Sequence, residues 1–141
     1  MISDVPVGLL LSGGVDSTAI LSLASRHANQ RISTFTVGFD HPDVQDERRY
    51  ARLAAREFDT DHHEISVAPD SFTAFLPRYV WHMEDPVCEP PAISLYYVSQ
   101  LASEHVKVVL SGEGGDEAFA GYSDYRRNLL LARLRAGLGP L

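Results

Sequence analysis

The sequence predicts an α/β fold with a parallel sheet of four or more strands in the order 3-2-1-4 and helices on both faces. Four short apolar or β-branched segments alternate with longer segments of helical periodicity, which is the pattern of strands joined by helical crossovers. One of the short segments, residues 7–11, is an uninterrupted apolar run, as expected of a strand covered on both faces of a parallel sheet. Right-handed crossovers then place the first strand centrally, with the second and third on one side and the fourth on the other.

The first half of the chain is predicted to contain three strands and two helices. The strands span residues 7–11, 32–39 and 62–67, and the last of them lies near a sheet edge. The first helix, 16–28, carries apolar residues at helical spacing. The second helix, 46–58, places charges on one face and apolar side chains on the other, namely Tyr50, Leu53, Ala54 and Phe58.

The second half is predicted to continue with helices and one further strand. Pro69 opens a helix in the favoured first-turn position. Three prolines exclude regular structure from residues 84–92. A helix over residues 93–104 and a buried strand over 106–110 follow, and the chain continues in a helix over 122–135.

Length and composition indicate one soluble globular domain over residues 1–141. A chain of 141 residues buries a sufficient core without disulfides or metals. The net charge of −7 argues against a nucleic-acid-binding surface. Since the chain has no long apolar run and no basic leader, we expect neither a membrane segment nor a signal peptide. The single cysteine, Cys88, fits a reducing compartment, so we expect a cytoplasmic protein.

A glycine turn joins the first strand to the first helix and reads Leu-Ser-Gly-Gly-Val-Asp-Ser-Thr over residues 11–18. Its glycines let backbone amides approach a ligand, and the helix directs its positive end at the turn. A phosphate or pyrophosphate is the natural occupant, with Ser12 and Ser17 as hydroxyl donors. Asp16 fits beside phosphates if Mg²⁺ bridges the two. The alternative is an ordinary strand–helix turn with Asp16 as the N-cap.

A second glycine-rich turn, residues 111–117, follows the fourth strand and reads Ser-Gly-Glu-Gly-Gly-Asp-Glu. The predicted strand order brings both turns to one crevice at the carboxyl ends of strands 1 and 4. Asp16 and Asp116 would then hold one or two Mg²⁺ ions against the β- and γ-phosphates of ATP, because a cation offsets the repulsion between the carboxylates. The alternative is a solvated acidic loop that caps a helix.

Other residues near the two turns are candidates for contacts with the nucleotide. Main-chain atoms of Leu11 and Val37 are predicted to flank the adenosine, and Ser111 and Gly112 to meet it from the opposite side. Glu113 is a third carboxylate and a candidate for an acid–base or transition-state role.

Several of these segments resemble known proteins. Residues 12–17 resemble the pyrophosphate-binding loop of the ATP pyrophosphatase superfamily, whose members adenylate a substrate and release pyrophosphate. Residues 110–122 closely resemble the matching segment of the asparagine synthetases and their relatives, which include β-lactam synthetases. Residues 35–39, 46–47 and 60–64 are similar to that family in order and spacing, so the resemblance covers nearly the whole chain.

The resemblance implies ATP-dependent activation of a carboxylate as an acyl-adenylate, followed by attack of ammonia to give an amide. It implies ATP and aspartate, or a similar carboxylate, as small-molecule substrates, with Mg²⁺ as the cofactor. The site residues that it implies are Ser12, Gly13, Gly14 and Ser17 for pyrophosphate, Asp16 and Asp116 for Mg²⁺, Leu11, Val37, Ser111 and Gly112 for AMP, and Glu113 with Asp116 for catalysis.

The chain also departs from the full-length family pattern. Family members begin with a glutaminase domain that has an N-terminal cysteine, whereas this sequence begins Met-Ile-Ser. We therefore expect a synthetase core truncated at both ends, with the glutaminase domain in the full-length protein. Residues 84–92 lack the threonine-and-arginine pattern of aspartate recognition. The rival functions are activation of another carboxylate, for amide transfer or β-lactam closure, and nucleotide binding without turnover.

Overall fold

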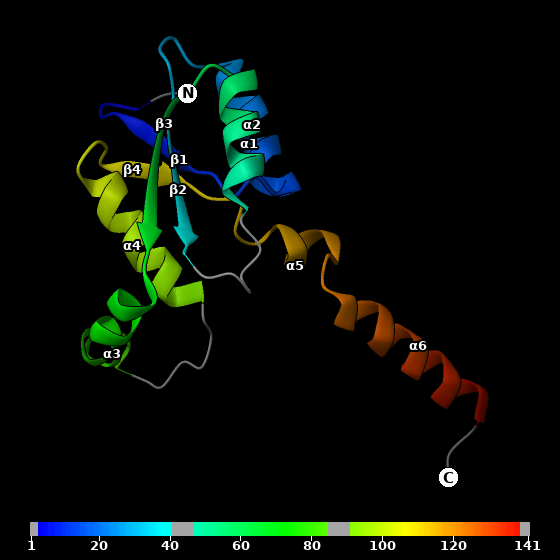
Figure 1. The fold of residues 1–141 in the computed structure, drawn as a ribbon. Coiled ribbons are helices and arrows are strands. Elements are labelled where there is room, and N and C mark those ends of the chain that lie inside the picture. The colour runs from blue at the N-terminus through cyan, green and yellow to red at the C-terminus, as the bar shows by residue number, and fades with distance from the viewer. Residues whose placement is uncertain (1–2, 41–46, 85–90, 139–141) are drawn as a thin grey trace. The chain divides into compact units, whose positions relative to one another are not determined.

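The computed structural model describes residues 3–40, 47–84 and 91–138. It contains one four-stranded, all-parallel sheet in the order β3-β2-β1-β4 (Figure 1). The predicted fold class and strand order are therefore confirmed. The prolines and the cysteine of residues 85–90, and the predicted start of the second helix at residue 46, lie outside the described residues.

The four strands are β1 (Val7–Leu10), β2 (Ser33–Phe39), β3 (Asp61–Val67) and β4 (Val108–Leu110). Leu9 of β1 lies opposite Thr34 of β2 on one side and Leu110 of β4 on the other. β3 forms one edge of the sheet, as its alternating pattern predicts. Since all strands are parallel, the segments that follow β1, β2 and β4 begin at the same edge of the sheet.

The described helices are α1 (Val15–Ser25), α2 (Arg48–Glu57), α3 (Pro69–Met83), α4 (Pro91–Ser103), α5 (Gly115–Phe119) and α6 (Ser123–Leu138). The short helix α5 was not predicted. It begins after Gly114, which adopts the left-handed conformation with φ 89°, and two acidic residues in its first turn favour a helix N-terminus. Within the described ranges, every helix is too short or too polar to span a bilayer.

The chain forms two compact units, Met1–Ser111 (unit 1) and Gly112–Leu141 (unit 2). Unit 1 contains the sheet and α1 to α4, and unit 2 contains α5 and α6. The single domain expected over residues 1–141 stays a prediction.

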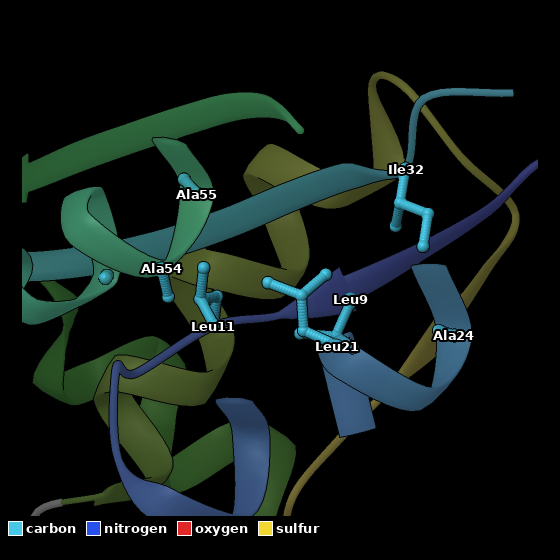
Figure 2. Packing of buried hydrophobic residues seen from close by; sticks show 8 residues of the cluster. Leu9, Leu11, Leu21, Ala24, Ile32, Ala54 and Ala55 are labelled. Carbon is cyan, nitrogen blue, oxygen red and sulfur yellow. The ribbon is translucent and has the colours of Figure 1, made fainter. Parts of the chain in front are cut away.

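On one face of the sheet, β1 packs against α1 and α2. Leu9, Leu11 and Leu21 are fully buried there (Figure 2). Burying one leucine side chain stabilises a fold by about 2 kcal/mol. This cluster therefore holds α1, and with it the end of the glycine turn, against the strand that precedes it.

On the other face, α4 covers the sheet. Phe35 of β2 packs against Val98 and Ala102 of α4, and all three are buried. Successive strand residues point to opposite faces, so Leu10 packs against this second cluster while its neighbour Leu9 enters the first. Helices thus lie on both faces of the sheet, as predicted.

The buried face of α2 differs from the prediction. Ala51, Ala54 and Ala55 face the core, whereas Tyr50 and Leu53 are each about half exposed. Small side chains let α2 lie close to the sheet and to the glycine turn, where larger ones would clash. The prediction is therefore right for Ala54 and for Phe58, which packs against this cluster, and wrong for Tyr50 and Leu53.

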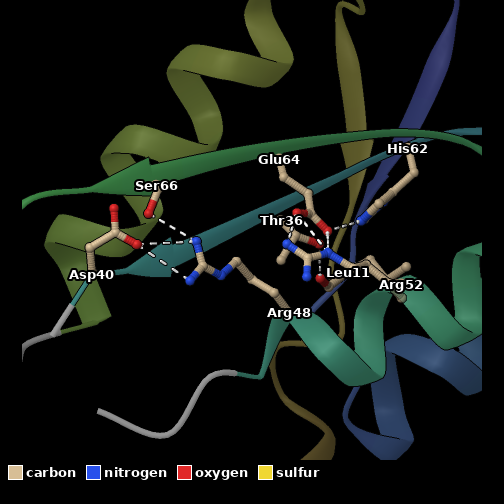
Figure 3. Close-up of polar contacts among 8 residues, drawn as sticks. All are labelled: Leu11, Thr36, Asp40, Arg48, Arg52, His62, Glu64 and Ser66. Atoms are coloured by element: carbon tan, nitrogen blue, oxygen red, sulfur yellow. Dashed lines mark hydrogen bonds and ion pairs between the residues drawn. The ribbon is translucent and has the colours of Figure 1, made fainter. Parts of the chain in front are cut away.

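Two arginines attach α2 to the edge strand β3 (Figure 3). The Nη1 group of Arg48 donates to Ser66 Oγ at 2.9 Å. One helical turn later, Arg52 donates to both carboxylate oxygens of Glu64 over distances of 2.6 to 3.0 Å. The four-residue spacing of these arginines on α2 matches the two-residue spacing of their partners on β3, so both arginines can pair at once.

The Glu64 carboxyl is held in its ionised form. Burial alone is the largest influence and raises its pKa, but hydrogen bonds from Arg52 and His62 and the charges of these groups together outweigh it. The net effect lowers the pKa of Glu64 from its ordinary value of 4.5. The link between α2 and β3 is therefore a charged one at neutral pH.

Candidate functional site

The glycine turn after β1 is closed by a pair of serine hydroxyl groups. Ser12 Oγ accepts a hydrogen bond from the Gly14 amide at 3.2 Å and lies 3.0 Å from Ser17 Oγ. The Ser17 hydroxyl is buried and is also 3.3 Å from the Gly14 carbonyl oxygen. These contacts shape the turn before any ligand arrives, which reduces the entropy lost on binding.

Gly13 is required by both its conformation and its surroundings. Its φ of 81° lies in the left-handed region. A Cβ atom at this position would lie 2.4 Å from the Ala51 nitrogen and 2.6 Å from the Tyr50 carbonyl carbon. The turn therefore rests directly on the backbone of α2, whose position is set by its alanine face and its arginine contacts with β3.

The N-terminus of α1 lacks a side-chain cap. Its N-cap residue is Gly14, not Asp16, so the interpretation of Asp16 as an ordinary N-cap is wrong. Among the described residues, the amides of Val15, Asp16 and Ser17 have no hydrogen-bond acceptor. Three free amides at the positive end of a helix form a site suited to an anion.

Asp16 lies in the first turn of α1, beside these amides. It is half-buried, and its carboxylate makes no ion pair or hydrogen bond to any other described residue. Carboxylate oxygens are the ligands that Mg²⁺ prefers, so Asp16 fits the predicted role. Over the described ranges, no three histidine, cysteine or acidic side chains are grouped to hold a metal.

Leu11 and Val37 lie at the carboxyl ends of neighbouring strands. The Leu11 amide donates to the Phe35 carbonyl oxygen at 2.8 Å, and the Leu11 carbonyl oxygen accepts a hydrogen bond from the Thr36 hydroxyl. In a strand, the main-chain N–H and C=O groups of every second residue point to the same side. Val37 therefore points its main-chain groups to the same side as Phe35, but beyond the end of β1. Whether Leu11 and Val37 flank one ligand stays a prediction.

The second turn begins at the carboxyl end of β4. Ser111 follows Leu110 directly and belongs to unit 1, at the same sheet edge as the glycine turn. Gly112, Glu113 and Asp116 belong to unit 2 and are described there by themselves. The convergence of Asp16 and Asp116 on one cation stays a prediction.

Within unit 2, the two acidic residues of the first turn of α5 differ. The Tyr122 hydroxyl donates to Glu117 Oε1 at 2.8 Å, and this bond is the main cause that raises the pKa of Tyr122 to about 12. The Asp116 carboxylate has no hydrogen bond or ion pair to the described residues, and a Cβ on Gly121 would clash with it. Of the two, Asp116 is the carboxylate free to bind a cation.

The site also depends on residues that the sequence reasoning missed. Thr36 fixes the Leu11 carbonyl, and the backbone of Tyr50 and Ala51 supports Gly13. Thr34 and Thr36 occupy every second position of an otherwise apolar strand, so they point to the same face of the sheet. This pattern is the one feature of the sequence that could have indicated polar contacts beneath α2.

Comparison with known proteins gives a consistent set of relatives. A sequence model of the family described as asparagine synthase matches residues 1–139 of this chain. A putative asparagine synthetase (glutamine-hydrolyzing) of Mycobacterium bovis is 47% identical over 131 residues, which are 93% of this chain and 20% of that protein. The asparagine synthetase (glutamine-hydrolyzing) 1 of Bacillus subtilis is 42% identical over 141 residues, covering 98% of this chain and 22% of that protein.

A relative with another printed name shares the same segment. The amidase chyE of Penicillium rubens is 31% identical over 142 residues, covering 91% of this chain and 21% of that protein. The chain thus spans about a fifth of the length of the curated relatives that it matches.

Proposed function

This chain belongs to the asparagine synthase family, and from that membership we propose that it is the ATP-binding part of an amide-forming ligase. In the proposed reaction the side-chain carboxylate of aspartate attacks the α-phosphorus of ATP, and pyrophosphate leaves. Ammonia then attacks the acyl carbon of the adenylate, AMP leaves with the bonding electron pair, and the nitrogen loses a proton to water.

The observation that carries this proposal is the uncapped N-terminus of α1 beside an unpaired carboxylate. The amides of Val15, Asp16 and Ser17 lack acceptors among the described residues, and a polyphosphate would supply them. The hydroxyl groups of Ser12 and Ser17 would orient the same group from the other side of the turn. The Asp16 and Asp116 carboxylates would hold Mg²⁺, and the bound ion would offset the negative charge of the phosphates.

The remaining assignments extend this binding mode to the whole nucleotide. We assign pyrophosphate to the turn that includes Gly13 and Gly14, because neither glycine has a side chain that would keep a ligand away from the backbone. We assign AMP to Leu11, Val37, Ser111 and Gly112, and formation of the adenylate to Glu113 with Asp116. We further propose a cytoplasmic protein whose ammonia comes from a glutaminase domain elsewhere in the full-length chain.

A second candidate function is the same chemistry on another carboxylate. It is favoured by the Penicillium rubens relative, whose printed name is an amidase. It is also favoured by residues 84–92, which lack a threonine-and-arginine pattern. A nucleotide-binding module without turnover is the candidate from a different class.

Calorimetric titration of ATP with and without Mg²⁺ tests the proposed site. We expect binding to require Mg²⁺, and both Asp16→Ala and Asp116→Ala to weaken it by about tenfold or more, the effect of losing one charge-assisted contact. Asp70→Ala is the matched control, because Asp70 is likewise an acid in the first turn of a helix. Equal ATP affinity in all four proteins would contradict the opposed-carboxylate site.

Turnover separates the three functions. Pyrophosphate release that depends on aspartate and ammonium would support the first function. Release with another carboxylate would support the second, and ATP binding without release from any carboxylate would support the binding module.

A further inference from the structure

A cleft of about 580 Å³ opens at the end of the sheet opposite the glycine turn. It lies between the C-terminal end of α2 and the amino ends of β2 and β3, and none of the residues assigned to ATP lines it. Its volume is within the range of roughly 300 to 1,000 Å³ that small-molecule sites occupy. The lining residues are Arg31, Arg52, Ala55, Arg56, Asp59, Thr60, His62 and Glu64.

The cleft is lined by three arginines and two acidic residues, so it carries one positive charge in excess. The Nη2 group of Arg31 pairs with Asp59 Oδ1 at 2.7 Å. Arg52 pairs with Glu64 through both carboxylate oxygens. The guanidinium group of Arg56 makes no hydrogen bond or ion pair to the other described residues. The two carboxylates are thus neutralised in place, and the remaining net charge is that of Arg56.

Two of the arginines direct unused donors at the cleft. Arg56 has all five of its N–H groups available for a ligand. Arg31 is clamped by the carbonyl oxygens of Asp59 and Thr60 at 3.1 and 3.3 Å, and its Nη1 group makes no bond within the described part of the chain. The Arg31 fork is therefore held in place, which lowers the entropy lost when its free nitrogen binds a ligand.

The hydrogen-bonding groups of Thr60, His62 and Glu64, which form the floor of the cleft, are already paired within the protein. Thr34 Oγ1 lies 2.8 Å from Thr60 Oγ1 and 2.9 Å from His62 Nδ1, and His62 Nε2 lies 2.9 Å from Glu64 Oε1. Each of these polar side chains has its partner within the protein. A ligand is consequently recognised by the arginines at the mouth and not by the floor.

We propose that this cleft binds a small phosphate-bearing anion, with Arg56 as the anchor and Arg31 Nη1 as the second donor. Guanidinium forks match the geometry of phosphate oxygens, and the number of free donors exceeds what one carboxylate accepts. This site is additional to the proposed ATP site and lies at the other end of the sheet.

Amide chemical shifts of the full chain, followed during titration with inorganic phosphate or glycerol 3-phosphate, test the proposal. Ionic strength is held constant with chloride, and acetate is titrated in parallel. We expect saturable shifts at Ala55, Asp59 and Thr60, which are separable from any shifts at residues 12–17. Arg56→Ala is expected to raise the dissociation constant about tenfold, whereas Arg49→Ala, an exposed arginine of α2 outside the cleft, leaves it within about twofold.

The same titrations show which kind of phosphate the cleft prefers and which outcomes would contradict the proposal. Tighter binding of glycerol 3-phosphate than of inorganic phosphate identifies an organic phosphate as the ligand class, and the reverse identifies the free ion. Equal weakening by Arg56→Ala and Arg49→Ala would overturn the proposal, because it would indicate general attraction to a basic helix. Shifts confined to residues 12–17, or acetate binding as tightly as phosphate, would overturn it as well.

Discussion

At the scale of the residue, two adjacent glycines have different roles. Gly13 has a φ of 81° and rests against the α2 backbone, where a Cβ would lie 2.4 Å from the Ala51 nitrogen. Gly14 has a φ of −69°, and the nearest atom to a Cβ there is Ser12 Oγ at 3.3 Å. The glycine pair looks symmetric in the sequence, but only its first member is required by the fold.

This difference predicts opposite outcomes for two alanine substitutions. We expect Gly13→Ala to lower the free energy of unfolding by about 2 kcal/mol or more, from left-handed strain and the clash with α2. Gly14→Ala is expected to change it by less than about 0.5 kcal/mol. Urea unfolding of both variants measures this, and equal losses would contradict the role given to the α2 backbone.

At the scale of the element, α2 is the part that connects the sheet edge to the candidate site. Its alanine face packs on the sheet and its arginines pair with β3, while its first turns support Gly13. The Arg52–Glu64 contact is the stronger of the two arginine links, because its bonds are short and reach both carboxylate oxygens. Loosening this helix would therefore disturb the glycine turn without touching it.

The lowered pKa of Glu64 predicts a pH-dependent contribution to stability. Because the pKa is depressed in the folded state, the contribution is full above the unfolded value of 4.5 and is lost as the pH falls through the folded value. We expect Glu64→Gln to lower the free energy of unfolding by about 1 kcal/mol at neutral pH, a modest value because Arg52 is half exposed.

Urea unfolding at a series of pH values measures that difference. The gap between wild type and Glu64→Gln should shrink as the pH falls below 4.5. The control is Glu57→Gln, because Glu57 is an exposed acid of α2 that takes no part in the contacts between Arg52, His62 and Glu64. A gap that stays constant with pH would contradict the charged link between α2 and β3.

At the scale of the whole molecule, the buried core lies within unit 1. All buried apolar side chains among the described residues belong to residues 1–111, and so do both clusters that flank the sheet. The residues proposed for catalysis, Glu113 and Asp116, belong to unit 2. Stability and the proposed chemistry are therefore separable along the chain.

A truncated chain of residues 1–111 tests this separation. We expect its thermal unfolding midpoint to lie within about 3 °C of the full chain, because every buried apolar side chain among the described residues belongs to residues 1–111. Magnesium-dependent ATP binding should be lost with Asp116. Leu21→Ala is expected to destabilise both lengths equally, by about 3 kcal/mol. A midpoint lowered by more than about 10 °C would show that residues 112–141 support the core.

The candidate site could be predicted only where its signals are continuous in the sequence. The turn of residues 11–18 combines glycines, hydroxyls and a carboxylate after an apolar strand, so the sequence alone predicts that it binds an anion. Three features of the site could be identified only from the structure, because each depends on which groups are near in space. They are the unpaired carboxylate of Asp16, the N-cap at Gly14 and the support of Gly13 by the α2 backbone.

The sequence by itself determined the α/β class, the strand order β3-β2-β1-β4 and the shared edge of the turns after β1 and β4. Periodicity is a property of neighbouring residues, and the handedness of crossovers restricts how strands can be ordered. The tertiary structure alone decided that Tyr50 and Leu53 of α2 are exposed, why Gly13 is required, and that Arg31, Arg52 and Arg56 share one cleft. These features depend on close packing between segments far apart in the chain, where small side chains and unpaired charges carry no local signal.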